Sequence, residues 1–199
     1  MARKDHRTGM VEATKELLQK QGYPGTGLKE ILEVSGAPKG SLYHYFPGGK
    51  EELGEAAIML SADEILASLS ALADLPPVES VDRFTTILTE ELERSDYEAG
   101  SPIATVALEM SSSSEVLREA CRRAYEQWMA EIRRPFLQAG IDPAAAKAAS
   151  LVAMSCVEGA LLLSRVQRST EPIRVVSLTL KLLTQMVMAG ALPQPPLDD

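Results

Sequence analysis

Apolar side chains recur at intervals of three and four residues along nearly the whole chain, the spacing of one face of an α-helix. The first such segment, with Met10, Ala13, Leu17 and Leu18 on one face, is predicted to end near Gly22. Further helices are predicted over residues 28–34, 38–46, 50–72, 79–95, 102–110, 113–138, 143–167 and 172–190. No stretch alternates between apolar and polar residues as a half-buried strand does. The predicted fold class is therefore all-α.

The last two predicted helices, 143–167 and 172–190, have apolar residues on more than one face. A helix that is apolar on nearly all sides has to be buried on nearly all sides. Two such helices in a chain of 199 residues favour a homodimer formed through them, with a thick core inside one subunit as the alternative. Lys147, Glu158 and Arg165 interrupt the first of them, which argues against a membrane span.

The segment 28–46 has the form of a helix-turn-helix unit, in which two short helices are joined by a turn at Gly36. Pro38 suits the first position of the second helix, because a missing N–H costs nothing there. Leu42 and Phe46 lie four residues apart and are expected to face the core. The polar and aromatic side chains around them are of the types that contact phosphates and base edges, and no acidic residue lies among them: Lys39, Ser41, Tyr43, His44 and Tyr45.

Charge is distributed unevenly along the chain. The net charge is −8, yet residues 1–50 contain eight Lys or Arg and five Asp or Glu, a formal charge of +3, so the remainder carries −11. A basic head on an acidic body attracts the phosphate backbone at one end of the molecule. The distribution therefore favours double-stranded DNA as a partner, although the total charge is negative.

These observations predict two domains. Residues 1–50 form a three-helix DNA-binding head, and residues 51–199 form a helical dimerisation domain in which the Pro-containing tail 193–199 is disordered. The N-terminus lacks the apolar stretch of a signal peptide. Cys121 and Cys156 form no CxxC pair and are expected to be small, reduced core residues, as in a cytoplasmic protein.

An enzyme is disfavoured, because both histidines, His6 and His44, lie in the head and no HExxH, GxSxG, Walker or GxGxxG sequence occurs. No cofactor and no metal site is expected. A helical adaptor without a specific DNA site is the remaining alternative, and a salt-dependent DNA-binding assay distinguishes it from a regulator.

Three segments resemble the TetR family of transcriptional regulators: GTGLKEI at 25–31, SGAPKGSLYHYF at 35–46 and KEEL at 50–53. The Ala-Pro pair at 37–38 and the Pro-Gly-Gly-Lys sequence at 47–50 resemble the branch that contains the LmrA/YxaF-type repressors. The resemblance implies a fold of nine or so helices, a homodimer through the last two long helices, and a ligand cavity in the C-terminal domain. It also implies a dimeric repressor that binds an inverted-repeat operator and is released by an effector, with the long fourth helix carrying the switch.

Carried over by position, the resemblance assigns DNA contacts to Lys39, Gly40, Ser41, Tyr43, His44 and Tyr45, and phosphate contacts to Thr26 and Lys50. Two departures bear on these assignments. Gly27 stands where the family usually has Ser or Thr, and the loop 47–49 before Lys50 is one residue longer than usual. Three consecutive helical residues point about 100° apart, so 43–45 cannot all read bases.

The effector cavity implied by the resemblance would be surrounded by helices that carry Glu109, Met110, Tyr125, Trp128, Met154 and Glu158. Met and aromatic residues in helices are more often core residues than ligand contacts. Glu158 is the sharper candidate, because a buried carboxylate needs a partner, which is Arg165, an arginine across the dimer or a ligand. The expected effector is a small hydrophobic or aromatic molecule of unknown identity.

Overall fold

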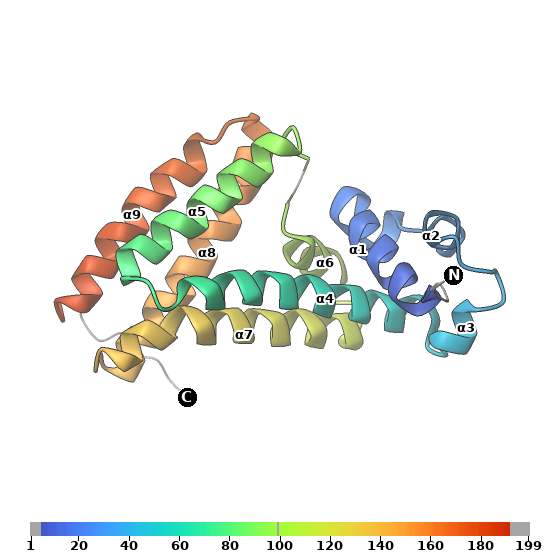
Figure 1. The fold of residues 1–199 in the computed structure, drawn as a ribbon, viewed down its shortest axis with the longest axis horizontal. Coiled ribbons are helices and arrows are strands. Elements are labelled where there is room, and N and C mark those ends of the chain that lie inside the picture. Colours follow the sequence, from blue (N-terminus) through green and yellow to red (C-terminus); the bar gives the residue numbers. More distant parts are fainter. Residues whose placement is uncertain (1–4, 99, 192–199) are drawn as a thin grey trace. The chain divides into compact units, whose positions relative to one another are not determined.

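The computed structural model describes residues 5–98 and 100–191, and within those ranges it contains helices and no strands (Figure 1). The helices are α1 (His6–Gly25), α2 (Leu28–Ser35), α3 (Leu42–Tyr45), α4 (Gly49–Leu72), α5 (Pro77–Arg94), α6 (Pro102–Met110), α7 (Glu115–Gln138), α8 (Pro143–Gln167) and α9 (Glu171–Met188). The all-α prediction is confirmed. The predicted bounds of α4 to α9 agree with the observed bounds to within about two residues. The tail 193–199 lies outside the described residues.

Proline and capping residues explain why these bounds could be predicted. Proline occupies one of the first two positions of α5, α6, α8 and α9, where its missing N–H leaves no helical hydrogen bond unmade. Ser101 caps α6 by accepting a hydrogen bond from the Ala104 N–H at 3.1 Å. Asp142 caps α8 by accepting from the N–H groups of Ala144 and Ala145. Such signals lie within a few residues of the helix end.

Helix α3 departs from the prediction. It begins at Leu42 instead of Pro38, so the assignment of Pro38 to the first helical position is wrong. The Pro38 carbonyl accepts hydrogen bonds from the Ser41 N–H at 2.9 Å and from the Ser41 Oγ at 2.7 Å. These bonds close a turn over Lys39 and Gly40, and the helix starts only after that turn.

The chain divides into two compact units, each of which includes parts of α4 and α7. The first unit comprises residues 5–64 and 101–125, and the second comprises 65–98, 100 and 126–191. In the first unit, α1 packs on both α2 and α6. Its fully buried side chains include Met10, Leu18, Ile31, Leu42, Phe46, Leu53, Ile58, Ile103, Val106 and Leu117.

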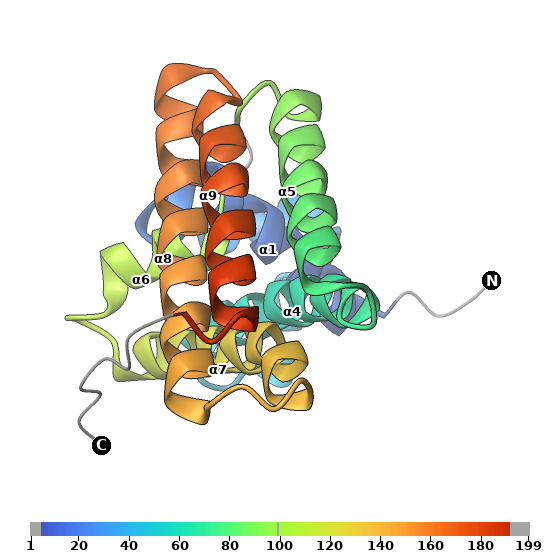
Figure 2. The same ribbon diagram turned by 90° about the vertical axis from the view of Figure 1, so that its left-hand side faces the viewer.

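In the second unit, α5, α8 and α9 run side by side in both ribbon views (Figures 1 and 2), and α9 packs on the other two helices. One apolar cluster contains Phe136, Ala146, Ala149 and Val187, and another contains Leu92, Ala160 and Ile173. The Thr85 and Ser177 hydroxyls share a buried hydrogen bond of 2.8 Å between α5 and α9. The small residues on the buried side of α8 let its neighbours approach closely.

The outer faces of α8 and α9 remain apolar and exposed in the single subunit. The exposed side chains are Leu151, Val152, Leu162, Leu163 and Val166 of α8 and Val175, Leu178, Leu182, Met186 and Met188 of α9. By length and composition, α8 is also the one described helix that would be able to cross a membrane. A helix that packs against a second subunit has the same composition.

Candidate DNA-binding surface

Two side chains of residues 38–46, which comprise α3 and the turn before it and are called the α3 segment, anchor the helix-turn-helix unit. Leu42 and Phe46 are 2% and 1% exposed, which confirms that they face the core. The Arg7 guanidinium of α1 lies 5.3 Å from the centre of the Phe46 ring, a cation–π contact that joins this segment to α1. Because both ends of a four-residue helix are held, its remaining side chains are presented in a fixed direction.

Several predicted DNA-contact residues lie on the open side of this anchor. Lys39, Gly40, Tyr43 and His44 are exposed, and the Tyr43 side chain is 65% exposed. Ser41 and Tyr45 are half-buried; the Ser41 hydroxyl donates to Pro38, and the Tyr45 ring meets the His44 ring edge-on at 4.9 Å between centroids. Among the three consecutive residues 43–45, the structure therefore exposes the first two most fully.

Gly40 has no role in packing within its own chain. A Cβ atom built at this position would meet no heavy atom within 4 Å, and its φ is not in the positive region that favours glycine. A glycine that its own fold does not require leaves room for a partner to approach the backbone closely.

A shallow hollow of about 390 Å³ lies between α2 and the segment that leads into α3. Its lining is mostly apolar, with two lysines among the residues: Leu28, Lys29, Leu32, Glu33, Ala37, Lys39, Leu42 and Tyr43. Lys29 pairs with Glu33 of the same helix at 3.6 Å, so the basic character of the hollow comes mainly from Lys39. A lysine and an exposed tyrosine beside an apolar surface suit the sugar-phosphate backbone, which offers both anionic oxygens and apolar sugar carbons.

Thr26 is placed differently from the expectation. It is 0% exposed, and its hydroxyl donates to the Gly22 carbonyl at 2.7 Å, while its N–H donates to the Tyr23 carbonyl at 3.2 Å. The hydroxyl is enclosed and already bonded, so a phosphate contact by Thr26 has to compete with this turn and stays a prediction. In this structure Thr26 fixes the turn between α1 and α2.

Lys50, at the start of α4, also turns inward. Its ammonium donates to the Tyr23 carbonyl at 2.7 Å and lies 4.3 Å from the centre of the Tyr23 ring. Burial lowers the pKa of Lys50 below its ordinary value, and the Glu109 carboxylate opposes that shift. A phosphate contact by Lys50 has to compete with these intramolecular partners, so it stays a prediction.

The six predicted effector-contact residues are divided between the units. Glu109 and Met110 of α6 and Tyr125 of α7 belong to the first unit. Trp128 of α7 and Met154 and Glu158 of α8 belong to the second unit, where Trp128 is buried and the other two are half-buried. Their assignment to an effector cavity stays a prediction.

Tyr23, near the end of α1, is not one of the predicted site residues, but in the structure it contacts both α4 and α6. Its N–H donates to the Glu109 Oε2 at 2.8 Å, and its carbonyl holds the Lys50 ammonium. A Cβ atom at Gly54 of α4 would lie 2.9 Å from its ring, so the glycine makes room for the tyrosine. Burial, with a contribution from the Glu51 charge, raises the pKa of the Tyr23 hydroxyl. The sequence predicts only that the first helix ends near Gly22, so nothing in this segment marked Tyr23 as a contact between helices.

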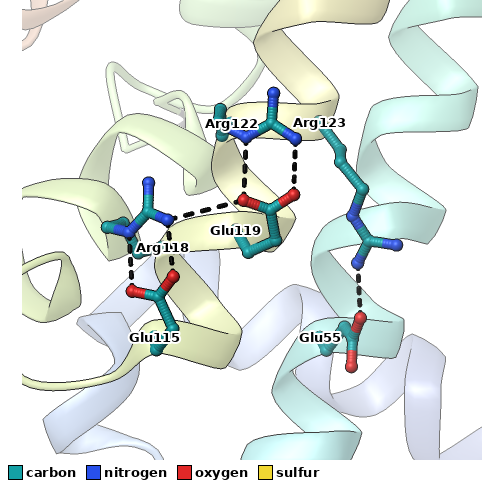
Figure 3. Close-up of polar contacts among 6 residues, drawn as sticks. All are labelled: Glu55, Glu115, Arg118, Glu119, Arg122 and Arg123. Carbon is teal, nitrogen blue, oxygen red and sulfur yellow. Dashed lines mark hydrogen bonds and ion pairs between the residues drawn. The ribbon is translucent and has the colours of Figure 1, made fainter.

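On the surface of the first unit, arginines and glutamates form a ladder along α7 (Figure 3). Arg118 pairs with Glu115 at 2.6 Å and with Glu119 at 3.5 Å, and Arg122 also pairs with Glu119. Exposed pairs of this kind contribute little to stability, because water and salt screen the charges. A separate pair between Arg123 and Glu55, a residue of α4, joins α7 to the helix that follows α3 (Figure 3).

Comparison with known proteins agrees with this geometry. Residues 10–57 match the family model for bacterial regulatory proteins of the tetR family. Residues 77–178 match the model for the C-terminal domain of LmrA/YxaF-like transcriptional regulators. The HTH-type transcriptional regulator LmrA of Bacillus subtilis (strain 168) is 37% identical over 175 residues, which are 87% of this chain and 93% of LmrA. The chain belongs to the TetR family of transcriptional regulators.

Other members of the TetR family are also similar over most of the chain. The uncharacterised regulator YxaF of the same organism is 32% identical over 88% of this chain and 93% of its own length. The solved structure of a TetR regulator from Legionella pneumophila has a TM-score of 0.80 at 22% identity and covers 94% of this chain and 100% of its own. Reduced NemR of E. coli has a TM-score of 0.79 at 21% identity, with 90% and 97% covered. This TetR-family protein is a ligand-responsive DNA-binding regulator and not an enzyme.

Proposed function

We propose that this TetR-family protein is a cytoplasmic, dimeric repressor that binds an inverted-repeat operator and is released by a small hydrophobic or aromatic effector. The main support is the α3 segment, where buried Leu42 and Phe46 hold exposed Lys39, Gly40 and Tyr43 outward. The DNA-binding head is proposed to comprise residues 1–50, and residues 51–199 the effector-binding and dimerisation domain.

In this proposal the α3 segment of each subunit enters a major groove, with half-sites about one helical turn (roughly 34 Å) or a multiple of it apart. Lys39 reaches a phosphate or a guanine edge, and Tyr43 contacts the operator with its exposed ring. Ser41, His44 and Tyr45 supply further contacts around them.

The exposed apolar faces of α8 and α9 support self-association through these two helices. Leaving ten large apolar side chains of one surface in water costs free energy that a second copy of the same surface recovers. The two faces belong to one unit, so the proposed interface does not depend on the position of the head.

The proposed DNA binding is tested with labelled duplexes from the region upstream of the protein's own gene, by fluorescence anisotropy over a range of salt concentrations. Affinity for the correct fragment is expected to fall steeply with salt, because bound phosphates release counterions. Lys39→Ala is expected to weaken binding, whereas Lys181→Ala, which removes a lysine paired with Asp82 in the second unit, leaves it within about twofold. A wild-type protein that binds none of the fragments at low salt refutes the proposal.

The effector site is proposed to include Trp128, Met154 and Glu158, which belong to the second unit. A thermal-shift screen of small aromatic compounds identifies an effector, and operator titration with and without it then measures the response. Trp128→Ala and Glu158→Ala are expected to change that response while operator affinity without effector stays nearly constant. By reciprocity, operator DNA has to weaken effector binding by the same factor. If both variants respond like the wild type, the effector binds elsewhere.

A further inference from the structure

The α1 helix is interrupted by a backbone conformation that only glycine adopts readily. Gly22 has φ 71° and ψ −179°, a region in which a Cβ atom is strained. The chain then turns through Tyr23 and Pro24 and begins α2 at Leu28. The direction in which α2 leaves α1 is therefore set by a few residues around Gly22.

The Glu109 carboxylate of α6 occupies the space that Gly22 leaves. A Cβ atom at Gly22 would lie 2.3 Å from the Glu109 Oε1 and 2.7 Å from its Oε2. In the same place the Tyr23 N–H donates to the Glu109 Oε2 at 2.8 Å. A carboxylate from a helix about 86 residues further along the chain thus completes the hydrogen bonding of the interrupted α1.

Tyr23 also binds the Lys50 ammonium, through its carbonyl and its ring. The Tyr23 carbonyl accepts from Lys50 at 2.7 Å, and the Tyr23 ring lies under the ammonium. Glu109 favours the charged form of this lysine, although burial disfavours it. These contacts connect α6 to α1 and α1 to α4 through a chain of three residues: Glu109, Tyr23 and Lys50.

We propose that Glu109 is a positioning residue of the DNA-binding surface: by holding the Gly22–Tyr23 peptide it sets the turn into α2 and places the Lys50 ammonium. This inference rests on the proposed function, in which Lys50 and the helix-turn-helix unit meet operator DNA. Glu109 itself need not touch the DNA. When the Glu109 carboxylate moves away, the Tyr23 N–H loses its hydrogen-bond partner and the turn is less restrained. The positions of α2, α3 and the Lys50 ammonium then become more variable.

Because Glu109 lies on α6, a movement of α6 can change the geometry of the DNA-binding surface. Helix α6 packs on α1 within the first unit, so a displacement of α6 reaches the Gly22–Tyr23 peptide directly. The contact also gives Glu109 a role other than the effector contact that the family resemblance implied.

The test uses the full-length protein, the upstream fragment that the wild type binds, and a random duplex of equal length. Glu109→Ala removes the acceptor, Glu109→Gln keeps an acceptor oxygen of the same reach, and Glu115→Ala removes another exposed carboxylate of the first unit as the charge control. Glu109→Ala is expected to weaken operator binding about fivefold, the effect of one exposed charge-assisted hydrogen bond. Glu109→Gln and Glu115→Ala are expected to stay within about twofold of the wild type.

Two further readouts separate positioning from a general loss of stability. Hydrogen exchange at the Tyr23 amide is expected to accelerate in Glu109→Ala and to stay slow in Glu109→Gln. In a Lys50→Ala background, Glu109→Ala is expected to have a clearly smaller effect on operator affinity, because part of its action passes through the lysine.

The outcomes distinguish this inference from the function on which it rests. A wild type that binds no fragment refutes the proposed function. A wild type that binds, with Glu109→Ala binding equally well or with Tyr23 exchange unchanged, refutes the inference alone. Equal losses in Glu109→Ala and Glu109→Gln refute it as well, because the hydrogen bond is then not what matters.

Discussion

Replacing Leu182 with alanine is expected to weaken self-association of this regulator about 30-fold. Leu182 lies on α9 in the exposed apolar face and is 61% exposed in the single subunit. Burying a whole leucine side chain is worth about 1.5–3 kcal/mol. This burial energy is multiplied by the exposed fraction of Leu182 and reduced for the methyl group that alanine keeps. The loss of association free energy is then about 1 kcal/mol per subunit. A two-fold interface contains the residue twice, which gives about 2 kcal/mol, or roughly 30-fold in Kd.

The assay is sedimentation equilibrium over a range of protein concentrations, with wild type and variants at the same salt. Leu108→Ala is the matched control, because Leu108 is 82% exposed but lies on α6, outside the α8 and α9 faces. It is expected to leave the dimer Kd unchanged. Leu182→Glu is expected to abolish the dimer at micromolar concentration, because association would bury two unpaired carboxylates.

Two results refute this reasoning. One is a wild type that remains monomeric at tens of micromolar, because the exposed apolar face then has another use. The other is an equal loss of association in Leu108→Ala and Leu182→Ala, which places the interface elsewhere. Thermal melts of each variant show whether a loss of dimer accompanies a loss of folding.

Three further outcomes are expected. Tyr43→Ala should lose about 1–3 kcal/mol of binding on the operator and much less on random DNA, measured by anisotropy on both duplexes; equal losses exclude a base contact. Burial raises the pKa of the Cys121 thiol to about 11, so at pH 8 only roughly 0.1% is thiolate. Iodoacetamide should therefore label half-buried Cys156 before Cys121 in the native protein, as read by mass spectrometry; faster labelling of Cys121 contradicts its burial. Gly22→Ala should lower the free energy of unfolding, measured in urea, by about 3 kcal/mol. Gly27→Ala, whose Cβ meets nothing within 4 Å, should lower it by under about 1 kcal/mol. Similar midpoints for the two glycine variants contradict the strain argument.

The helices of this protein could be predicted because their causes are local. Proline near the start of α5, α6, α8 and α9 and apolar residues at helical spacing act within a few residues of each other. The burial of Leu42 and Phe46 followed from their spacing of four within the helix-turn-helix pattern. The family could be recognised for the same reason, since its motif lies in one short stretch of the head.

The start of α3 shows where local reasoning failed. Pro38 is compatible with a first helical position, but it is equally compatible with a turn, and the hydrogen bonds from Ser41 decide in favour of the turn. Proline restricts its own φ and removes one donor, which both conformations tolerate. The choice depends on how the following Leu42 reaches the core.

The sequence by itself determined the helical fold, the family and the basic segment in which the predicted DNA-contact residues lie. The tertiary structure alone decided the partners of two polar residues. Lys50 is bonded to Tyr23, and the Glu109 carboxylate fills the space above Gly22. The physical reason is that a helical pattern fixes which face a residue occupies, whereas its hydrogen-bond partner depends on which distant segment packs there. Glu109 and Gly22 meet only because α6 folds back onto α1.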